Sequence, residues 1–252
     1  MPQTPTLPWL ERDAPFPPLQ QAWDDQTPMP GLLAAGADLS VKRLVQAYSA
    51  GIFPWFSADQ PILWWSPSPR MVLQVAHFKF HRSLRQTIRQ WRASGEYRLS
   101  IDRAFGQVIH ACATQTRLGQ RGTWIVPAMQ AAYVDLHHAG HAHSIEVWHG
   151  ERLIGGLYLV NLGRAVFGES MFSLVSNASK VALCGLVNLC QAQGAQWIDC
   201  QQDTPHLGSL GASPIPRAQF EQLISRDCAQ TDLDWDERWI YWDQMLLNEP
   251  GK

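Results

Sequence analysis

Apolar side chains first fall into a regular pattern at residues 36–51, GADLSVKRLVQAYSAG. They recur at the i, i+3, i+4 and i+7 positions of one helical face: Val41, Leu44, Val45 and Tyr48. Ser40 precedes them as an N-cap, and Gly51 stands where the left-handed residue that ends a helix belongs. The pattern predicts a short amphipathic helix. The first thirty residues carry eight prolines and no such period, which predicts an irregular or extended surface segment.

Two later stretches also have helical spacing. Residues 101–113, IDRAFGQVIHACA, place four apolar side chains on one face: Phe105, Val108, Ile109 and Cys112. Residues 126–140, VPAMQAAYVDLHHAG, open with Pro127 at the first helical position and close on Gly140. Between these helices and the first one, residues 70–78, RMVLQVAHF, alternate like a strand.

Three short apolar runs follow, HSIEVW, RLIGGLYLV and RAVFGE, separated by the turn-like HGE and NLG. Such spacing predicts an antiparallel meander. A helix is expected over residues 177–193, ending at Gly194, and QWIDCQ reads as the next strand. The tail, with Trp235, Trp239 and Trp242, should pack a last helix or strand against the body. We therefore expect an α+β fold.

Three antiparallel strands, a helix and a further strand form the central part of an N-acetyltransferase-like (GNAT-like) mixed-sheet domain, although a fold does not fix a function. Acyl-CoA users of that fold hold pyrophosphate at a glycine-rich turn before the helix. Here the connection reads GESMFSLVSNASK and lacks repeated glycines. The sequence therefore argues against ordinary CoA binding.

Residues 51–70, GIFPWFSADQPILWWSPSPR, thread four prolines between five large aromatic residues: Phe53, Trp55, Phe56, Trp64 and Trp65. So many prolines argue against a helix or an ordinary strand. The rings either pack between two domains or line a pocket for a nucleobase or an apolar side chain.

A basic stripe lies in KFHRSLRQTIRQWR, where cations recur at helical spacing after a lysine: Lys79, Arg82, Arg85, Arg89 and Arg92. On a helix the four guanidinium groups project from one face with no acid between them. The stripe is either a solvated helical face or a surface that follows a phosphate backbone.

Two segments at predicted strand ends carry acids, FGESMFS and IDCQQD. Strand alternation points Asp199 and Gln201 to one face, and Glu169 ends the preceding strand. The three side chains could meet in a cleft. The plainer interpretation is the exposed face of an edge strand, with Glu169 in a surface salt bridge.

A histidine cluster, LHHAGHAHS, contains His137, His138, His141 and His143. It lacks the helical i, i+4 pair with a partnered acid and the Cys and His pairs of known zinc sites. We expect structural histidines here and no metal.

Composition narrows the class of protein. The chain has 252 residues with 46% hydrophobic content, enough for a large core, and a net charge of −2 excludes a histone-like polycation. Five cysteines without a C-x-x-C spacing indicate a reduced, intracellular protein. Neither a signal peptide nor a run of about 18 apolar residues is found. We expect a cytoplasmic protein that does not enter a membrane.

Several long blocks in fixed order closely resemble a known family over about residues 31–220: GLLAAGADLSVKRLVQAYSAGIFPWFS, PILWWSPSPR, AFGQVI, GTWI, GHAHSIEVW, GGLYLV, GESMFS, NASK and IDCQ. This family is the bacterial leucyl/phenylalanyl-tRNA-protein transferases. The resemblance implies a small N-terminal domain with a proline-rich leader (residues 1–70) and a GNAT-like aminoacyl-transfer domain (residues 71–252).

The resemblance also implies an activity. Leu or Phe, and Met less well, would move from aminoacyl-tRNA to the N-terminal α-amine of proteins that begin with Arg or Lys. The product would be a degradation signal under the N-end rule. No cofactor is implied, since no CoA pyrophosphate needs holding, and we expect a monomer.

Site residues carry over by position from the resemblance. Aromatic positions around the tRNA 3′ adenosine and its amino acid match Tyr48, Trp55 and Trp124. An apolar cavity for the Leu or Phe side chain would draw on Leu157, Val166, Leu183, Leu186 and Ile198. The polar centre matches Glu169, Asp199 and Gln201, while the basic stripe would meet tRNA phosphates.

The mechanism that follows asks the protein for little beyond positioning and stabilisation. The aminoacyl ester is already activated, so the enzyme must position an amine and stabilise a tetrahedral oxyanion. We expect Asp199, acting through Gln201, to orient the amine and to accept or relay its proton. Glu169 would complement the cationic acceptor terminus.

Two other classes stay open. An RNA-binding module without catalysis would keep the stripe and the aromatic platform but would not need Asp199, Gln201 and Glu169 at one cleft. A metal-dependent hydrolase built on the histidine cluster would be sensitive to a strong chelator.

Overall fold

A four-stranded sheet forms the N-terminal part of the protein. The computed structural model describes residues 6–115 and 124–247. In this sheet the strand order is β1-β2-β4-β3, with β1 parallel to β2 and the other pairs antiparallel. The elements around it are β1 (Trp9–Leu10), η1 (Leu19–Gln21), β2 (Leu32–Gly36), α1 (Val41–Ser49), β3 (Phe53–Pro54) and β4 (Leu63–Trp65).

One expectation for this region was wrong, since the aromatic segment contains the short strands β3 and β4. The first thirty residues were expected to be irregular or extended, and their described part (residues 6–30) contains only the two-residue strand β1 and the short helix η1, with β2 following it. These strands are two to five residues long. Because the strands are so short, too few residues alternate to give a sequence signal. Pairing with other segments of the chain stabilises them. The helix at residues 41–49 is confirmed, with the Ser40 side chain accepting the Arg43 N–H at 3.3 Å.

A seven-stranded mixed sheet forms the centre of the molecule, in the order β11-β5-β10-β9-β8-β7-β6. Only the β9–β10 pair is parallel in this sheet. The strands are β5 (Arg70–Gln74), β6 (Tyr97–Ile101), β7 (Ala142–His149), β8 (Arg152–Leu162), β9 (Ala165–Ser173), β10 (Trp197–Gln201) and β11 (Ser213–Ile215). The predicted meander and α+β class are confirmed, while likeness to the GNAT fold stays a prediction.

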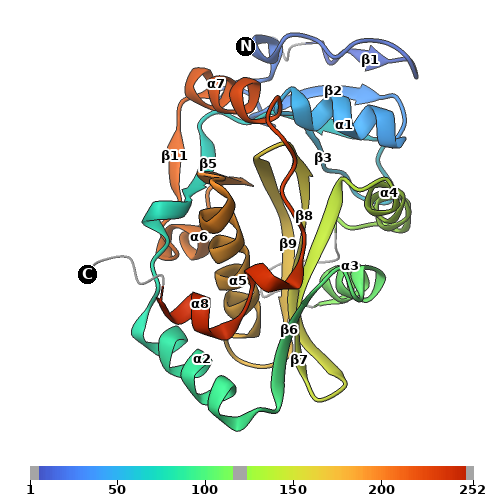
Figure 1. The fold of residues 1–252 in the computed structure, drawn as a ribbon. Helices are drawn as coiled ribbons and strands as arrows, with labels where there is room; N and C mark the ends of the chain where they lie inside the picture. The colour runs from blue at the N-terminus through green and yellow to red at the C-terminus, as the bar shows by residue number, and fades with distance from the viewer. Residues whose placement is uncertain (1–5, 116–123, 248–252) are drawn as a thin grey trace.

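Helices cover both faces of this sheet (Figure 1). One face carries α3 (Phe105–Thr114) and α4 (Pro127–His138). The other carries α2 (Arg82–Ser94), α5 (Ala178–Gln193) and α8 (Trp242–Leu247). The shorter elements are η2 (Val75–His77), α6 (Pro205–Ser209), α7 (Arg217–Asp227) and η3 (Glu237–Trp239). Two apolar cores result, and neighbouring residues of β9 divide between them, Val166 into one and Phe167 into the other.

Helix α7 joins the C-terminal part of the chain to the N-terminal sheet. Gly51 has φ +76°, and a Cβ there would lie 3.0 Å from Ile224 and 3.2 Å from Phe220. Arg217 donates hydrogen bonds to the carbonyls of Leu19 and Ser66. Contacts between the two parts are therefore extensive, and the expected division at residue 70 stays a prediction. Within residues 6–115 and 124–247, no helix has the length and apolar content needed to cross a bilayer.

Candidate active site

A cavity of about 530 Å³ opens among β5, β8, β9 and β10 of the large sheet and the helices α5 and α6. Its wall is mostly apolar, with Leu73, Leu157, Met171, Phe172, Leu183, Leu186, Ile198, Leu207 and Leu210. Four of the five residues expected around an amino-acid side chain lie on this wall. The fifth, Val166, is fully buried in the core and does not line the cavity.

Glu169 carries the only carboxylate among the described residues that line the cavity. Its side chain is 9% exposed. Glu169 Oε1 accepts hydrogen bonds from the Tyr48 hydroxyl at 2.7 Å and from Gln201 Nε2 at 2.8 Å. Glu169 Oε2 accepts one from the Tyr133 hydroxyl at 3.1 Å. The predicted meeting of Glu169 and Gln201 is therefore seen, with two tyrosines added.

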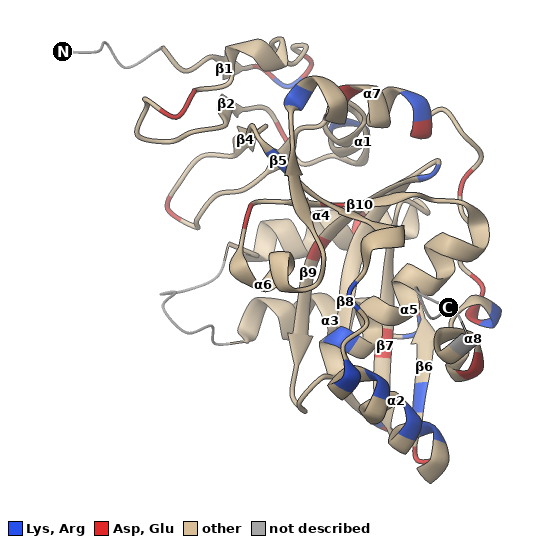
Figure 2. Ribbon diagram, turned by 90° about the vertical axis from the view of Figure 1, so that its left-hand side faces the viewer, with Lys and Arg blue, Asp and Glu red and all other residues tan. Residues whose placement is uncertain are grey.

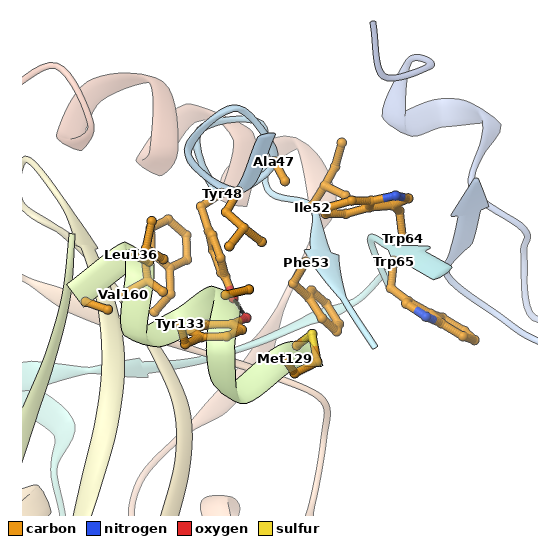
Figure 3. Packing of buried hydrophobic residues seen from close by; sticks show 14 of the residues in the cluster. Ala47, Tyr48, Ile52, Phe53, Trp64, Trp65, Met129, Tyr133, Leu136 and Val160 are labelled. Carbon is orange, nitrogen blue, oxygen red and sulfur yellow. Dashed lines mark hydrogen bonds between the residues drawn. The ribbon is translucent and has the colours of Figure 1, made fainter. Parts of the chain in front are cut away.

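The two tyrosines come from different helices and converge. Figure 3 shows Tyr48 from α1 and Tyr133 from α4 pointing toward one another, with their hydroxyl oxygens within hydrogen-bond distance. Each phenol has one proton, so when both donate to Glu169 neither donates to the other. Tyr133 was missed by sequence reasoning, because within AAYVDL it resembles any buried residue of an apolar helical face. Both rings are fully buried.

Burial sets the protonation of this cluster. It raises the pKa of Glu169 to about 7, the negative charge of Asp199 adds to that rise, and the hydrogen bonds from Tyr48, Tyr133 and Gln201 oppose it. Burial and the charge of Glu169 also hold the pKa of Tyr48 and of Tyr133 well above the ordinary value. The phenols therefore remain hydrogen-bond donors near neutral pH.

Asp199 does not line the cavity and has no exposed surface. Arg70 binds it through two parallel hydrogen bonds, Nε to Oδ1 at 2.8 Å and Nη2 to Oδ2 at 2.6 Å. Asp199 Oδ1 also accepts the backbone N–H of Gln201 at 2.9 Å. The structure thus brings Asp199 next to Gln201, as predicted, but seals it inside the protein with a cation.

Arg70 is a second residue of this site that sequence reasoning missed. Its guanidinium lies between two rings, 4.8 Å from the centre of Phe53 and 4.5 Å from that of Phe220. It also donates to the carbonyl of Gly51 at 3.3 Å. The only sequence signal was an arginine directly before the apolar run MVL, where a buried partner would be required.

A bulge in β10 directs Gln201. Asp199 and Gln201 pair with the consecutive residues Val72 and Met71 of β5, so the register shifts between them. Gln201 itself has φ +62°, a left-handed conformation uncommon outside glycine. This local backbone shape places the Gln201 amide beside Glu169.

The three expected aromatic contacts occupy different places. The Tyr48 ring is buried against Phe167, with ring centres 5.1 Å apart, so only its hydroxyl reaches the polar centre. Trp55 and Trp124 are partly buried against the same apolar core. Trp55 meets Trp65 edge-on at 5.2 Å. None of Tyr48, Trp55 and Trp124 lines the cavity.

The basic stripe lies on α2, where Figure 2 shows Lys and Arg gathered. Arg82, Arg89 and Arg92 are exposed, and Arg85 is partly buried over the ring of Phe80. Arg92 forms an exposed ion pair with Asp243 of α8 at 2.5 Å. Arg92 is therefore already paired within the chain.

The stripe begins next to the cavity. The backbone N–H of exposed Lys79 donates to the Leu210 carbonyl at 2.9 Å, and His81 Nε2 lies 2.8 Å from the Ser209 carbonyl. Leu210 lines the cavity. The basic stripe thus starts, at Lys79, beside one wall of the cavity.

The histidine cluster lies elsewhere. His143 Nδ1 is 2.6 Å from Asp102 Oδ2, and its ring stacks on Trp235 at 4.1 Å. His137 stacks on Phe105 at 4.3 Å. Among the described residues, no three potential metal ligands are grouped together, and His137, His138, His141 and His143 are absent from the cavity wall.

Comparison with known proteins identifies the family. The profile of the leucyl/phenylalanyl-tRNA protein transferase family matches residues 72–225, and that of its N-terminal domain matches residues 37–68. Three relatives are each named leucyl/phenylalanyl-tRNA–protein transferase. The protein of Albidiferax ferrireducens is 54% identical over 98% of this chain and 97% of its own. That of a Polaromonas species is 54% identical over 96% and 95%, and that of Leptothrix cholodnii 51% identical over 98% of each. The chain belongs to the leucyl/phenylalanyl-tRNA–protein transferase family.

Proposed function

We propose that this protein is an aminoacyltransferase that moves Leu or Phe from its tRNA to the N-terminus of a protein. The observation that carries the proposal is an apolar cavity with a single described carboxylate in its wall. An apolar side chain can enter such a cavity, and a cationic amine can meet the carboxylate beside it.

The donor side chain would lie against Leu157, Leu183, Leu186 and Ile198, with Val166 supporting the wall from the core. Selection would rest on the shape of the cavity. Because one methylene in an apolar pocket is worth only about 1–3 kcal/mol, Met should be accepted less well rather than rejected.

The acceptor would be drawn to Glu169. The groups that donate to its carboxylate are two phenols and one amide, all of them neutral. An ionised carboxylate with neutral partners in an apolar setting favours a cation. The preferred acceptors are therefore proteins that begin with Arg or Lys, whose α-amine and side chain both carry charge. The added Leu or Phe would then act as a degradation signal.

The tRNA would contact both the basic stripe and the partly buried tryptophans. Guanidinium groups on α2 would contact phosphates, which gives binding without dependence on tRNA sequence. Trp55 and Trp124 would offer ring surface to the 3′ adenosine, and the Tyr48 hydroxyl would belong to the polar centre. The reaction would take place in the cytoplasm, in a monomer that needs neither metal nor cofactor.

Transfer of radiolabelled leucine from charged tRNA tests this function. The acceptor is a peptide with N-terminal Arg, and the matched control is the same peptide with N-terminal Ala. Label in the Arg peptide alone is the expected result. If no peptide is labelled while charged tRNA still binds, the protein is an RNA-binding module and the proposed reaction is wrong.

A further inference from the structure

We propose that Glu169 is the proton acceptor of the transfer reaction, and that Asp199 only holds Gln201 in place. The inference rests on the proposed function. From the sequence, Asp199 was expected to take the proton, and Glu169 was expected only to attract the acceptor.

Accessibility separates the two carboxylates. Asp199 has no exposed surface, and its two oxygens accept three hydrogen bonds from Arg70 and the Gln201 backbone. A proton could reach Asp199 only by displacing a buried guanidinium. Glu169 lines the cavity and is the nearest carboxylate that a substrate can touch without that rearrangement.

Gln201 gives the amine its position. The Gln201 Nε2 group donates to Glu169 Oε1 at 2.8 Å, which directs the amide nitrogen toward the carboxylate and leaves the amide oxygen to accept an N–H from the acceptor. An amine bound to that oxygen lies beside Glu169. The backbone N–H of Gln201 is held by Asp199. The pair of Asp199 and Arg70 therefore determines where the amine attacks.

The surroundings of Glu169 suit a base near neutral pH. Tyr48 and Tyr133 donate to it from α1 and α4, and the charge of Asp199 acts on it from β10. Other titratable groups around the cavity and the centre are Tyr158 on β8, Cys200 on β10, His206 on α6 and Arg70 on β5. Burial raises the Glu169 pKa to about 7. A general base is most efficient when its pKa lies near the pH at which the reaction runs.

In the proposed reaction one proton moves twice, first from the amine nitrogen to Glu169 and then from Glu169 to the ribose oxygen. The neutral α-amine nitrogen attacks the ester carbonyl carbon, and the N–C bond forms. As that nitrogen becomes acidic, it gives one proton to the Glu169 carboxylate. The bond between the carbonyl carbon and the ribose oxygen then breaks, and Glu169 returns the proton to that oxygen. The products are an amide and the 3′ end of a tRNA with a hydroxyl group.

Steady-state rates of transfer at saturating aminoacyl-tRNA and varied Arg-peptide, from about pH 5.5 to about pH 8, test the role. In the wild-type protein, two ionisations should limit the rate in acid, that of Glu169 and that of the amine. Glu169→Gln should lower kcat by about 100-fold or more and leave one ionisation. The matched control is Glu146→Gln. Glu146 is a buried carboxyl whose pKa is also raised to about 7 but which does not line the cavity, so both ionisations should remain.

Tyr133→Phe is a milder second variant for the case in which Glu169→Gln does not fold. The Tyr133 hydrogen bond opposes the rise in the Glu169 pKa, so its loss should move the acid limb of the rate to higher pH while transfer persists. A merely structural role of Tyr133 would lower the amount of folded protein without moving that limb.

Three results would overturn the inference. If Glu169→Gln raises only the acceptor KM and keeps kcat and both ionisations, Glu169 binds the acceptor but does not take its proton. Folded Asp199→Asn that loses one ionisation while Glu169→Gln keeps both would return the proton to Asp199. Wild-type protein that transfers nothing at any pH would overturn the proposed function together with this role, a result distinct from the other two.

Discussion

Asp199 and Glu169 are close enough in one polar centre for the charge of Asp199 to act on Glu169. Their hydrogen-bond partners, however, differ in charge. Asp199 is sealed in the protein with the guanidinium of Arg70. Glu169 stands at the cavity wall with two phenols and an amide. Asp199 has a cationic partner inside the fold, whereas the donors to Glu169 are neutral and a cation would have to come from what enters the cavity. One carboxylate is therefore suited to structure and the other to exchange of a proton.

Glu146 shows that a raised pKa does not by itself mark a reactive site. Its carboxylate is fully buried, and it accepts from the hydroxyls of Ser100 and Ser144 and, at 3.4 Å, from the Ala104 N–H. Burial raises its pKa to about 7, as for Glu169. Since Glu146 does not line the cavity, the difference between these two glutamates lies in access.

The largest effect should come from removing the cation of Asp199. Arg70→Met leaves a buried carboxylate without its partner, which should lower the free energy of unfolding by about 3–5 kcal/mol. Urea unfolding measures this loss. The double variant Arg70→Met with Asp199→Leu should recover most of it, because a buried pair can be replaced by apolar groups at little cost. Equal stability of Arg70→Met and the wild type would show that the pair does not hold this region.

The next effect is a dependence of stability on pH. A folded-state pKa raised from 4.5 to about 7 stabilises the folded protein below pH 4.5, and that stabilisation is lost as pH rises through 7. Glu169 and Glu146 should each account for roughly 3 kcal/mol of this loss. Glu169→Gln and Glu146→Gln should both flatten the fall of unfolding free energy between pH 5 and pH 8, as thermal unfolding across pH would show. A slope unchanged in both variants would mean that neither carboxyl has a raised pKa.

A smaller effect is expected from a single phenol. Tyr48→Phe removes one neutral donor to Glu169 and should cost about 1 kcal/mol of stability. The Tyr48 hydrogen bond opposes the rise in the Glu169 pKa. Without it that pKa should rise further, and the loss of stability should extend to higher pH. Chemical unfolding at several pH values tests both points. Tyr241→Phe is the control, because Tyr241 is 59% exposed and the substitution should change neither.

The smallest effect should come from an ion pair at the surface. Arg92 and Asp243 lie 2.5 Å apart, but their side chains are 51% and 64% exposed. Asp243→Asn should therefore change stability by less than about 1 kcal/mol. Because it releases a cation of the basic stripe, tRNA affinity should stay equal or rise slightly, and more so at low salt. A loss of affinity would place Asp243 itself in the tRNA contact.

Local sequence signals predicted most of the fold. The helices at residues 41–49, 105–114 and 127–138 were visible because apolar period, N-cap and terminal glycine act within a few residues. The strands β1 and β3 were invisible, since two residues show no alternation and their stability comes from pairing with distant partners.

The candidate site was predicted less completely. Glu169, Asp199 and Gln201 were found from strand ends and from the resemblance to a family. The orientation of Asp199 was not found, because it depends on Arg70, which lies 129 positions earlier. Alternation along one strand gives the face of a side chain but not the residue that comes to meet it.

That separation also orders events during protein synthesis. At about 5–20 residues per second, a ribosome needs on the order of ten seconds to go from Arg70 to Asp199. Phe220 and Ile224, which pack against the N-terminal half, are made later still. Arg70 is therefore made well before the carboxylate that pairs with it in the folded protein. The cavity is likewise incomplete until β10 and α6, which form part of its wall, have been made.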